Sequence, residues 1–202
     1  WIDGLRKVAD HYIDNPAYSV ILSCLMHAVA YCSQGTGHFA QYRDAKTASS
    51  LKDILIYRQR SLPEYFTKKY KSVVKNLATK PPIYKSKITS RDYTDLIKSL
   101  PEDTTIYADP PYCFVHYSRF YHALETLVKY DYPSLQYKGG ELVKGRYREE
   151  RHQSPFCIKT KVPKAFEDLF TGILKKRHNL ALSYSNTGMI SLDELGDLAG
   201  SI

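Results

Sequence analysis

The sequence lacks an apolar run long enough to cross a membrane, and it lacks a charged-then-apolar leader at its start. These two absences predict a cytoplasmic protein with no membrane partner. Cysteine is also scarce, and no two cysteines have the Cys-x-x-Cys spacing of a zinc site. We therefore expect free thiols, a reducing compartment and no metal. The cysteines are Cys24, Cys32, Cys113 and Cys157.

The composition is ordinary for a single globular domain of 202 residues, since 43% of them are apolar and 25% are charged. The 29 lysines and arginines exceed the 21 acidic residues, which gives a net charge of +8. A basic balance favours a polyanionic partner, although a solvated basic surface produces the same count. Composition therefore permits a nucleic-acid partner without selecting it.

One stretch combines a strand signal with reactive side chains. Residues 105–108 form an apolar run typical of a buried strand, and the run stops at Asp109. Pro110 and Pro111 then prevent both helix and further strand pairing. In open α/β sheets the carboxyl ends of the strands are where ligands bind. The alternative is that Asp109 and Pro110 form only a turn.

This segment has the chemistry to bind an exocyclic amine. The carboxylate of Asp109 and the carbonyl of Pro110 can accept both amine hydrogens, which directs the nitrogen lone pair toward an electrophile. The ring of Tyr112 offers a flat face for a base taken out of a duplex. We therefore take Asp109, Pro110, Pro111 and Tyr112 as candidate catalytic residues.

The N-terminal part of the chain is expected to be helical. Residues 1–13 have amphipathic spacing, Pro16 opens a second apolar helix, and residues 51–77 are helical with an interruption near Pro63. The last of these segments interleaves lysines and arginines with aromatic residues, as a nucleic-acid face or a solvated basic helix would. The Pro81-Pro82 pair marks the expected boundary between a helical region, 1–80, and a sheet region, 81–202.

The sheet region is expected to alternate strands and helices. Gly139-Gly140 predicts a hairpin with a primed turn, and Pro163 opens a helix that leads to a parallel neighbour of the central strand. The expected strands are 83–89, 105–108, 135–138, 141–144 and 180–184, and the expected helices are 93–100, 119–130, 163–174 and 191–198.

Two polar segments are candidates for contacting nucleic acid. The first follows the second helix, and the alternative is a solvated connection between helices. The second lies in the basic hairpin-loop 134–160, where arginines suit phosphates and Gln153 and Ser154 suit base edges; the alternative is a basic surface loop. The candidates are His38, Gln41, Arg43, Arg146, Arg148, Arg151, His152, Gln153 and Ser154.

Four stretches together resemble the DNA adenine methyltransferases of the Dam type, which carry an Asp-Pro-Pro-Tyr motif. These are Asp109-Pro110-Pro111-Tyr112, residues 35–42 (GTGHFAQY), residues 145–156 (GRYREERHQSPF) and residues 182–188 (LSYSNTG). The resemblance covers most of the chain. It implies transfer of a methyl group from S-adenosylmethionine to the exocyclic amine of adenine in double-stranded DNA, and it admits a cognate restriction endonuclease as a further partner.

The resemblance also implies a fold and further site residues. The fold class is α/β, with a Rossmann-like S-adenosylmethionine-dependent methyltransferase core, incomplete in this chain, and an α-helical insert. The cofactor-binding candidates are Asp92, Tyr93 and Asp109, although Asp92 would equally cap the following helix. Ser185 and Asn186, with Tyr112, would line the pocket for the target base.

One element of the resembled family is missing from the sequence. No Phe-x-Gly-x-Gly turn, which in that family holds the methionine end of the cofactor, follows an early strand. We expect from this that the chain is truncated at both ends. Two other functions stay open: a non-catalytic DNA-binding module derived from such an enzyme, and an amino-methyltransferase that acts on RNA or protein.

Overall fold

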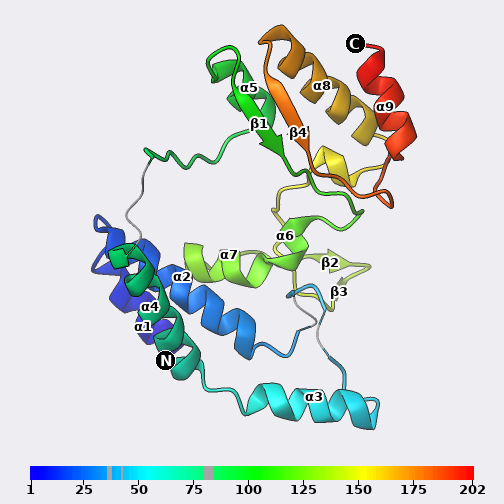
Figure 1. Ribbon diagram of the computed structural model, residues 1–202. Coiled ribbons are helices and arrows are strands. Elements are labelled where there is room, and N and C mark those ends of the chain that lie inside the picture. The colour runs from blue at the N-terminus through cyan, green and yellow to red at the C-terminus, as the bar shows by residue number, and fades with distance from the viewer. Residues whose placement is uncertain (36–37, 42, 80–83) are drawn as a thin grey trace. The chain divides into compact units, whose positions relative to one another are not determined.

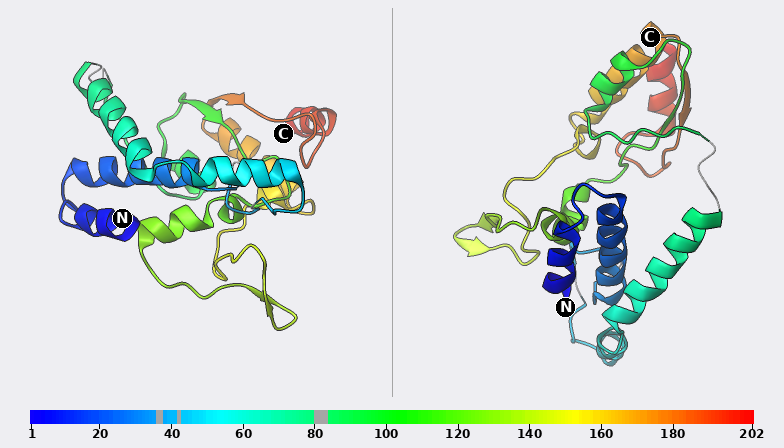
Figure 2. Two further views of the ribbon diagram at one scale, coloured as in Figure 1. Left: turned by 90° about the horizontal axis from the view of Figure 1, so that it is seen from below. Right: turned by 90° about the vertical axis from the view of Figure 1, so that its left-hand side faces the viewer.

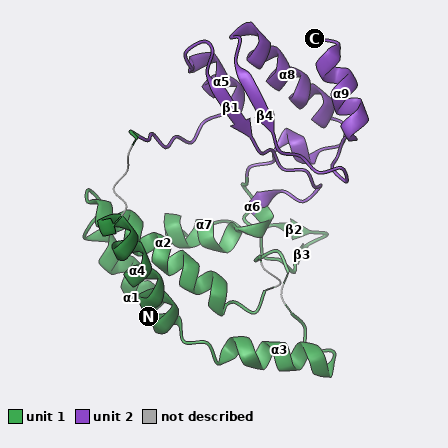
Figure 3. Ribbon diagram, viewed as in Figure 1, with its two compact units in different colours: residues 1–85, 119–151 green, residues 86–118, 152–202 purple. Residues whose placement is uncertain are grey.

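The computed structural model describes residues 1–35, 38–41, 43–79 and 84–202 (Figure 1). The chain divides into two compact units, coloured separately in Figure 3. Unit 1 comprises residues 1–85 and 119–151, and unit 2 comprises residues 86–118 and 152–202. The expected boundary at Pro81-Pro82 lies outside the described residues, as do Thr36, Gly37, Tyr42 and Ile83.

Unit 1 is mainly helical and is built around α2, whose start is set locally by the sequence. The side chain of Asn15 accepts a hydrogen bond from the backbone N–H of Ala17 (2.9 Å), and Pro16 occupies the first turn. Both α1 and α4 pack against α2, as Figure 2 shows from two sides. The bounds are α1 (Ile2–Asp10), α2 (Pro16–Cys32), α3 (Ala48–Arg58), α4 (Leu62–Thr79) and α7 (His122–Lys129).

The structure confirms the helices predicted in this region, with different ends. The first helix stops at Asp10 and does not reach Ile13. The segment 51–77 is divided as expected, since α3 and α4 are separated just before Pro63. The single helix predicted over 119–130 is wrong. Tyr121 leaves the helical region (φ −116°, ψ 12°) and separates α6 (Tyr117–Phe120) from α7.

Residues 119–151 belong to unit 1 in the structure, whereas the division at residue 80 places them with the sheet region. The reason is that α7 packs against α2 and is held by Arg6 of α1. Arg6 is buried, and its guanidinium donates to the carbonyls of Leu127 (3.1 Å) and Val128 (3.0 Å). It also pairs with Asp10. These bonds satisfy the last carbonyls of α7, which have no partner within the helix.

The predicted hairpin is confirmed in unit 1. β2 (Tyr137–Lys138) pairs antiparallel with β3 (Glu141–Leu142). Gly139 (φ 60°) and Gly140 (φ 83°) form the turn between them, and both have the left-handed backbone that a primed turn requires.

Unit 2 is a small α/β unit. β1 (Thr105–Ala108) pairs parallel with β4 (Asn179–Leu182), which confirms the predicted neighbour of the central strand. The core lies on α8, which contacts α5, α9 and the 3₁₀ turn η1; Phe166 of α8 is completely buried. The bounds are α5 (Tyr93–Ser99), η1 (Pro155–Cys157), α8 (Val162–Lys175) and α9 (Leu192–Gly200).

The apolar run of residues 105–108 predicts a buried strand, but only one face of β1 is buried. Ile106 and Ala108 pack against the core, but Tyr107 is 70% exposed. The difference arises because side chains alternate across a sheet and the core covers one face of this two-stranded sheet.

The strand predicted over 83–89 is wrong for the part that the structure describes. Residues 84–89 form no strand and pair with no described strand, and the side chain of Ile88 is 98% exposed. Alternating residues indicate a strand only where one face becomes buried and a neighbour accepts the backbone hydrogen bonds, and this segment has neither. No described helix has the length and apolar character to cross a membrane.

Candidate active site

The candidate catalytic segment leaves the carboxyl end of β1 beside the end of β4. Ala108 is in register with Leu182, and the N–H of Ser183 donates to the carbonyl of Ala108 (2.8 Å). Asp109 is exposed, whereas Pro110 is buried. Because a proline has no N–H, Pro110 and Pro111 cannot extend the pairing with β4. The strand therefore ends with the carboxylate of Asp109 accessible and the backbone after it rigid.

A pocket of about 930 Å³ lies within unit 2 and brings several of the candidates together. Asp109, Pro110 and Pro111 line it from the end of β1, while Asp92 and Tyr93 line it from the start of α5. Its apolar walls are formed by residues of α5, β1, η1 and α8. They include Leu96, Ile97, Ile106, Phe156 and Leu169.

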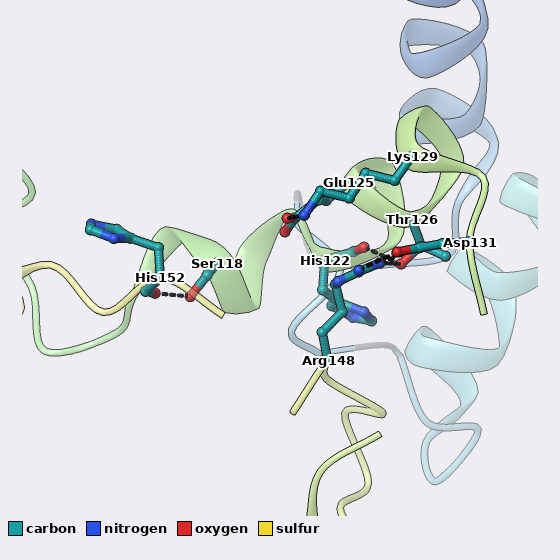
Figure 4. A network of polar contacts seen from close by, with 8 residues as sticks. All are labelled: Ser118, His122, Glu125, Thr126, Lys129, Asp131, Arg148 and His152. Atoms are coloured by element: carbon teal, nitrogen blue, oxygen red, sulfur yellow. Dashed lines mark hydrogen bonds and ion pairs between the residues drawn. The ribbon is translucent and has the colours of Figure 1, made fainter. Parts of the chain in front are cut away.

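The same pocket is lined by residues from two further segments. His152 and Ser154, predicted from the sequence to meet DNA, lie in its wall. So do His116, Tyr117 and Ser118, which sequence reasoning did not select. The hydroxyl of Ser118 donates to the backbone carbonyl of His152 (2.6 Å), which ties the two segments together (Figure 4). Closeness to Tyr112 in the sequence was the only signal for the missed residues.

Asp92 caps α5. The N–H and the hydroxyl of Thr94 both donate to Oδ1 of Asp92, at 2.9 and 2.6 Å. These hydrogen bonds, the hydroxyl's first, lower the pKa of the Asp92 carboxyl below its ordinary value. The capping alternative is therefore confirmed, and the second carboxylate oxygen of Asp92 is not used by Thr94.

Tyr93 is fixed as part of the pocket wall. Its hydroxyl donates to the carbonyl of Ala165 (3.0 Å), and its ring lies 5.3 Å from that of Phe156. Burial, with Asp168 nearby, raises the pKa of the Tyr93 hydroxyl to about 12. The phenol is therefore neutral at physiological pH and serves as a donor and an aromatic surface.

Tyr112 stands beside Tyr184, which follows β4. The two rings meet edge to face, with centroids 6.4 Å apart, and Tyr112 is 44% exposed. Tyr184 is fixed more firmly, because its hydroxyl accepts from the N–H of Met189 (3.0 Å) and its ring packs on Phe166. The contact between the two tyrosine rings thus joins the segment after β1 to the segment after β4.

Ser185 and Asn186, the candidates for the target-base pocket, lie in the turn that follows Tyr184. The hydroxyl groups of Ser185 and Thr187 are 2.9 Å apart, and the N–H of Gly188 donates to the carbonyl of Ser185 (3.0 Å). Asn186 is exposed. The pairing of β1 with β4 places this turn at the same sheet edge as Asp109.

The first DNA-contact segment, in unit 1, is engaged in internal contacts. The ring of His38 stacks on Phe120 at 4.3 Å. The guanidinium of Arg43 donates to the carbonyl of Gly35 (2.6 Å) and pairs with Asp53 (3.3 Å). Gln41 is exposed. Of the three candidates, only Gln41 has a side chain that forms no hydrogen bond, ion pair or ring contact with the described residues.

The candidates of the basic loop are divided between the units. Arg146, Arg148 and Arg151 belong to unit 1, whereas His152, Gln153 and Ser154 belong to unit 2. Arg146 is exposed and has a left-handed backbone (φ 49°), and Gln153 is also exposed.

Arg148 is committed to an internal ion pair. Its guanidinium donates to both carboxylate oxygens of Asp131 (2.7 and 2.5 Å) and to the hydroxyl of Thr126 (3.0 Å), as Figure 4 shows. The Arg148 side chain is 9% exposed. Hydrogen bonds from Arg148 are the main cause that lowers the pKa of the Asp131 carboxyl. This geometry holds the loop to α7 rather than presenting Arg148 to a ligand.

The described residues contain no group of three His, Cys, Asp or Glu side chains arranged to hold a metal ion. His122, for example, makes a contact within the protein. Its Nε2 lies 3.2 Å from the carbonyl of Phe39, and burial lowers the pKa of its imidazole. His122 is thus a neutral structural residue of α7.

A parallel strand pair that ends at an acid beside a pocket is typical of ligand-binding α/β proteins, whose ligands lie at the carboxyl ends of the strands. Comparison with models of known families identifies one family. Residues 22–184 match the model of the D12 class N6 adenine-specific DNA methyltransferase. The chain therefore belongs to this family, which confirms the resemblance read from its motifs.

Curated relatives are modification enzymes. The chain is 30% identical, over 98% of its length, to modification methylase LlaI of Lactococcus lactis subsp. lactis. It is 35% identical, over 58% of its length, to the type II methyltransferase M.FokI of Planomicrobium okeanokoites. The matches span 29% and 17% of those two relatives' lengths. No solved structure matches the chain.

Proposed function

We propose that the complete protein containing this chain transfers a methyl group from S-adenosylmethionine to the exocyclic amine of adenine in double-stranded DNA. The observation that carries the proposal is the Asp109-Pro110-Pro111 segment, which ends β1 and lines the pocket of unit 2. The family supports it, because its description specifies the N6 position of adenine.

Asp109 and Pro110 would position the amine. The carboxylate of Asp109 and the carbonyl of Pro110 each accept one amine hydrogen, and the nitrogen lone pair is thereby withdrawn from the ring and aimed at the methyl donor. When bound, S-adenosylmethionine supplies an electrophilic methyl group on a sulfonium whose thioether leaves without assistance. Asp109 would also accept the proton that the methylated nitrogen releases.

The pocket residues fit the cofactor's chemistry. Ligand pockets typically measure about 300–1,000 Å³ and combine apolar walls with a few polar groups, and a pocket of about 930 Å³ with two carboxylates matches that description. Asp92 and Asp109 can accept from amino or hydroxyl groups, and Tyr93 can contact a purine. The parallel pairing of β1 and β4 through α8 supports a Rossmann-like core in unit 2.

Tyr112 would stack on the adenine after it leaves the duplex, and Ser185 and Asn186 would complete that pocket. The partial exposure of Tyr112 and the fixed ring of Tyr184 beside it support this role. Unit 1 would contribute DNA contacts, for which Gln41, Arg146 and Arg151 are better placed than Arg43 and Arg148, whose guanidinium groups have acidic partners.

The relatives' names support a restriction-modification context, since they are called modification methylases or type II methyltransferases. A cognate restriction endonuclease is therefore part of the proposal as a partner. The Asp-Pro-Pro-Tyr segment alone would also suit an amino-methyltransferase of RNA or protein, so the substrate must be tested directly.

The test is to incubate the complete protein with radiolabelled S-adenosylmethionine and one substrate at a time. The three substrates are duplex DNA, RNA and protein. We expect label in DNA only, recovered as N6-methyladenine after digestion. Label in RNA or protein would select the alternative enzyme. DNA binding without any transfer would indicate a non-catalytic module.

A further inference from the structure

One arginine of unit 1 lies over a tyrosine ring, and a second arginine lies nearby. The guanidinium carbon of Arg119 is 5.3 Å from the centroid of the Tyr147 ring. Arg119 follows Ser118 and Arg151 precedes His152, and the hydrogen bond between Ser118 and His152 (2.6 Å) brings the two arginines close together. Tyr147 is a fixed platform, because its hydroxyl donates to the carbonyl of Ala40 (2.9 Å) and its ring meets the edge of His122.

Several N–H groups of this pair are buried without a bonding partner. Nε of Arg119 and both Nε and Nη1 of Arg151 are inaccessible and form no hydrogen bond within the described parts of the chain. Within the described residues the Arg151 side chain forms one hydrogen bond, a long one of 3.4 Å from Nη2 to Oε1 of Gln136. Both arginines are half-buried as residues.

No acid in the described part of the chain neutralises the two charges. Among the described residues neither Arg119 nor Arg151 forms an ion pair, and the acids that neighbour Arg151 in sequence, Glu149 and Glu150, are exposed. Arg148 shows the contrast, since Asp131 binds its guanidinium at both oxygens.

Two like charges that are partly removed from water, without a counter-charge, destabilise one another. Burial and the charge of Arg119 lower the pKa of Arg151 accordingly. A tetrahedral oxyanion at the two guanidinium groups would supply the missing counter-charge and relieve the repulsion, because guanidinium groups bind phosphate with paired hydrogen bonds. Buried polar groups without partners are uncommon enough that each one points to a missing ligand or to strain.

We propose that Arg119 and Arg151 together bind one phosphate group of the DNA backbone, on the platform formed by Tyr147, and that Arg148 takes no part. The assignment of DNA as the source of the phosphate rests on the proposed function. The phosphate chemistry itself rests only on the arrangement of the three side chains.

The first test uses inorganic phosphate and the complete protein. We expect phosphate to raise the melting temperature above that in chloride of equal ionic strength. Arg119→Gln and Arg151→Gln should each abolish the difference. Lys7→Gln, which removes an exposed charge of α1, and Arg148→Gln, which removes an arginine of the same loop, should retain it. No effect on the wild type, or an effect that survives in Arg119→Gln, would overturn the site.

The second test identifies the source of the phosphate through the salt dependence of duplex binding. Each phosphate contact contributes roughly 0.9 to the slope of log K against log salt. Since both arginines bind one phosphate, each single variant and the double variant should all lose about one unit or less. A loss of about two units in the double variant would indicate two separate phosphates and contradict the shared site.

The two tests also separate this proposal from the proposed function. Phosphate stabilisation with an unchanged DNA slope would show that the site binds free phosphate, and the assignment to DNA would be wrong. Both expected results without methyl transfer would leave the phosphate site intact and reject catalysis.

Discussion

Single residues in unit 2 carry two kinds of role at once, and Asp92 shows this best. One carboxylate oxygen receives both hydrogen bonds from Thr94, so the residue starts α5. The same side chain lines the pocket that contains Asp109. A substitution at this position therefore mixes helix stability with ligand binding unless the two are separated by the choice of variant.

Asp92→Asn and Asp92→Ala should separate the two roles. Asparagine caps helices about as well as aspartate, whereas alanine costs about 1 kcal/mol. We expect Asp92→Ala to lower the free energy of unfolding at pH 7 by more than Asp92→Asn does, because asparagine keeps the cap and loses only the charge, while both variants weaken S-adenosylmethionine binding by the complete protein in calorimetry. Unchanged affinity in both would leave Asp92 with its capping role alone.

The pH dependence gives a check on the same residue. Because the folded-state pKa of Asp92 is lowered, its charged form stabilises the fold above the unfolded pKa, and this contribution disappears as the pH falls through the folded value. Asp92→Asn should lack that part of the acid dependence, which denaturant titrations at several acidic pH values would show.

Cys157 provides a second prediction at this scale. It is 4% exposed, and burial, followed by the nearby Cys113, raises the pKa of its thiol to about 11. The thiolate is the reactive form. We therefore expect Cys157 to resist iodoacetamide at pH 8 in the folded protein and to react once the protein is unfolded, as mass spectrometry of peptides would show. Labelling of Cys157 at the rate of an unfolded control would contradict its burial.

The raised pKa of Cys157 also predicts how the stability of the protein depends on pH. The folded state holds the Cys157 proton more tightly than the unfolded state, whose ordinary value is 9.0. Its contribution to stability is complete below that value and is lost as the pH rises toward about 11.

At the scale of elements, the turn after β4 depends on a close approach between Gly188 and Tyr184. A Cβ atom on Gly188 would lie 2.5 Å from Cε1 of Tyr184, well inside contact distance. The tyrosine ring cannot move freely, since it packs on Phe166 and its hydroxyl is bonded to Met189. The ring that stands beside Tyr112 is therefore positioned by the absence of a side chain at residue 188.

Gly188→Ala should therefore destabilise the protein by about 1–3 kcal/mol, as overpacking typically does, and should slow turnover by displacing Tyr184. Gly196→Ala is the matched control, because nothing lies within 4 Å of that position in α9. We expect the control to stabilise by up to about 1 kcal/mol through helix propensity. Equal melting temperatures for the two variants would show that the turn adapts without strain.

The elements that could be predicted from the sequence are those set by local signals. Pro16 and Pro163 lie in the first turns of α2 and α8, and Gly139-Gly140 forms the hairpin turn. The strand expected at 83–89 failed because a strand requires a partner elsewhere in the chain. No local pattern reveals whether one exists.

The candidate site divides in the same way. Asp109-Pro110-Pro111 was recognisable because its motif is contiguous and its strand ends there. The partner of Arg148 was not, because Asp131 is separated from it by the whole hairpin. Arg119 was missed for a related reason: its closeness to Arg151 comes from folding and leaves no trace in either segment.

In the whole molecule, the residues proposed for methyl transfer and those proposed for phosphate binding belong to different units. Unit 2 contains the pocket and the segments that follow β1 and β4, and unit 1 contains the helices, the hairpin and the Arg119–Arg151 pair. Residues 119–151 interrupt unit 2 in the sequence, so the hairpin-loop is connected at both ends to the pocket-lining segments. The family match extends across both units.

The proposed role of Asp109, to position the adenine amine for methyl transfer, can be tested by single-turnover methylation with Asp109→Ala in the complete protein. Removing the carboxylate removes an acceptor for the amine without removing a residue of the buried core. We expect N6-methyladenine formation to be abolished while duplex binding, measured in parallel, is retained. Methylation by Asp109→Ala at the wild-type rate would show that Asp109 does not have this role.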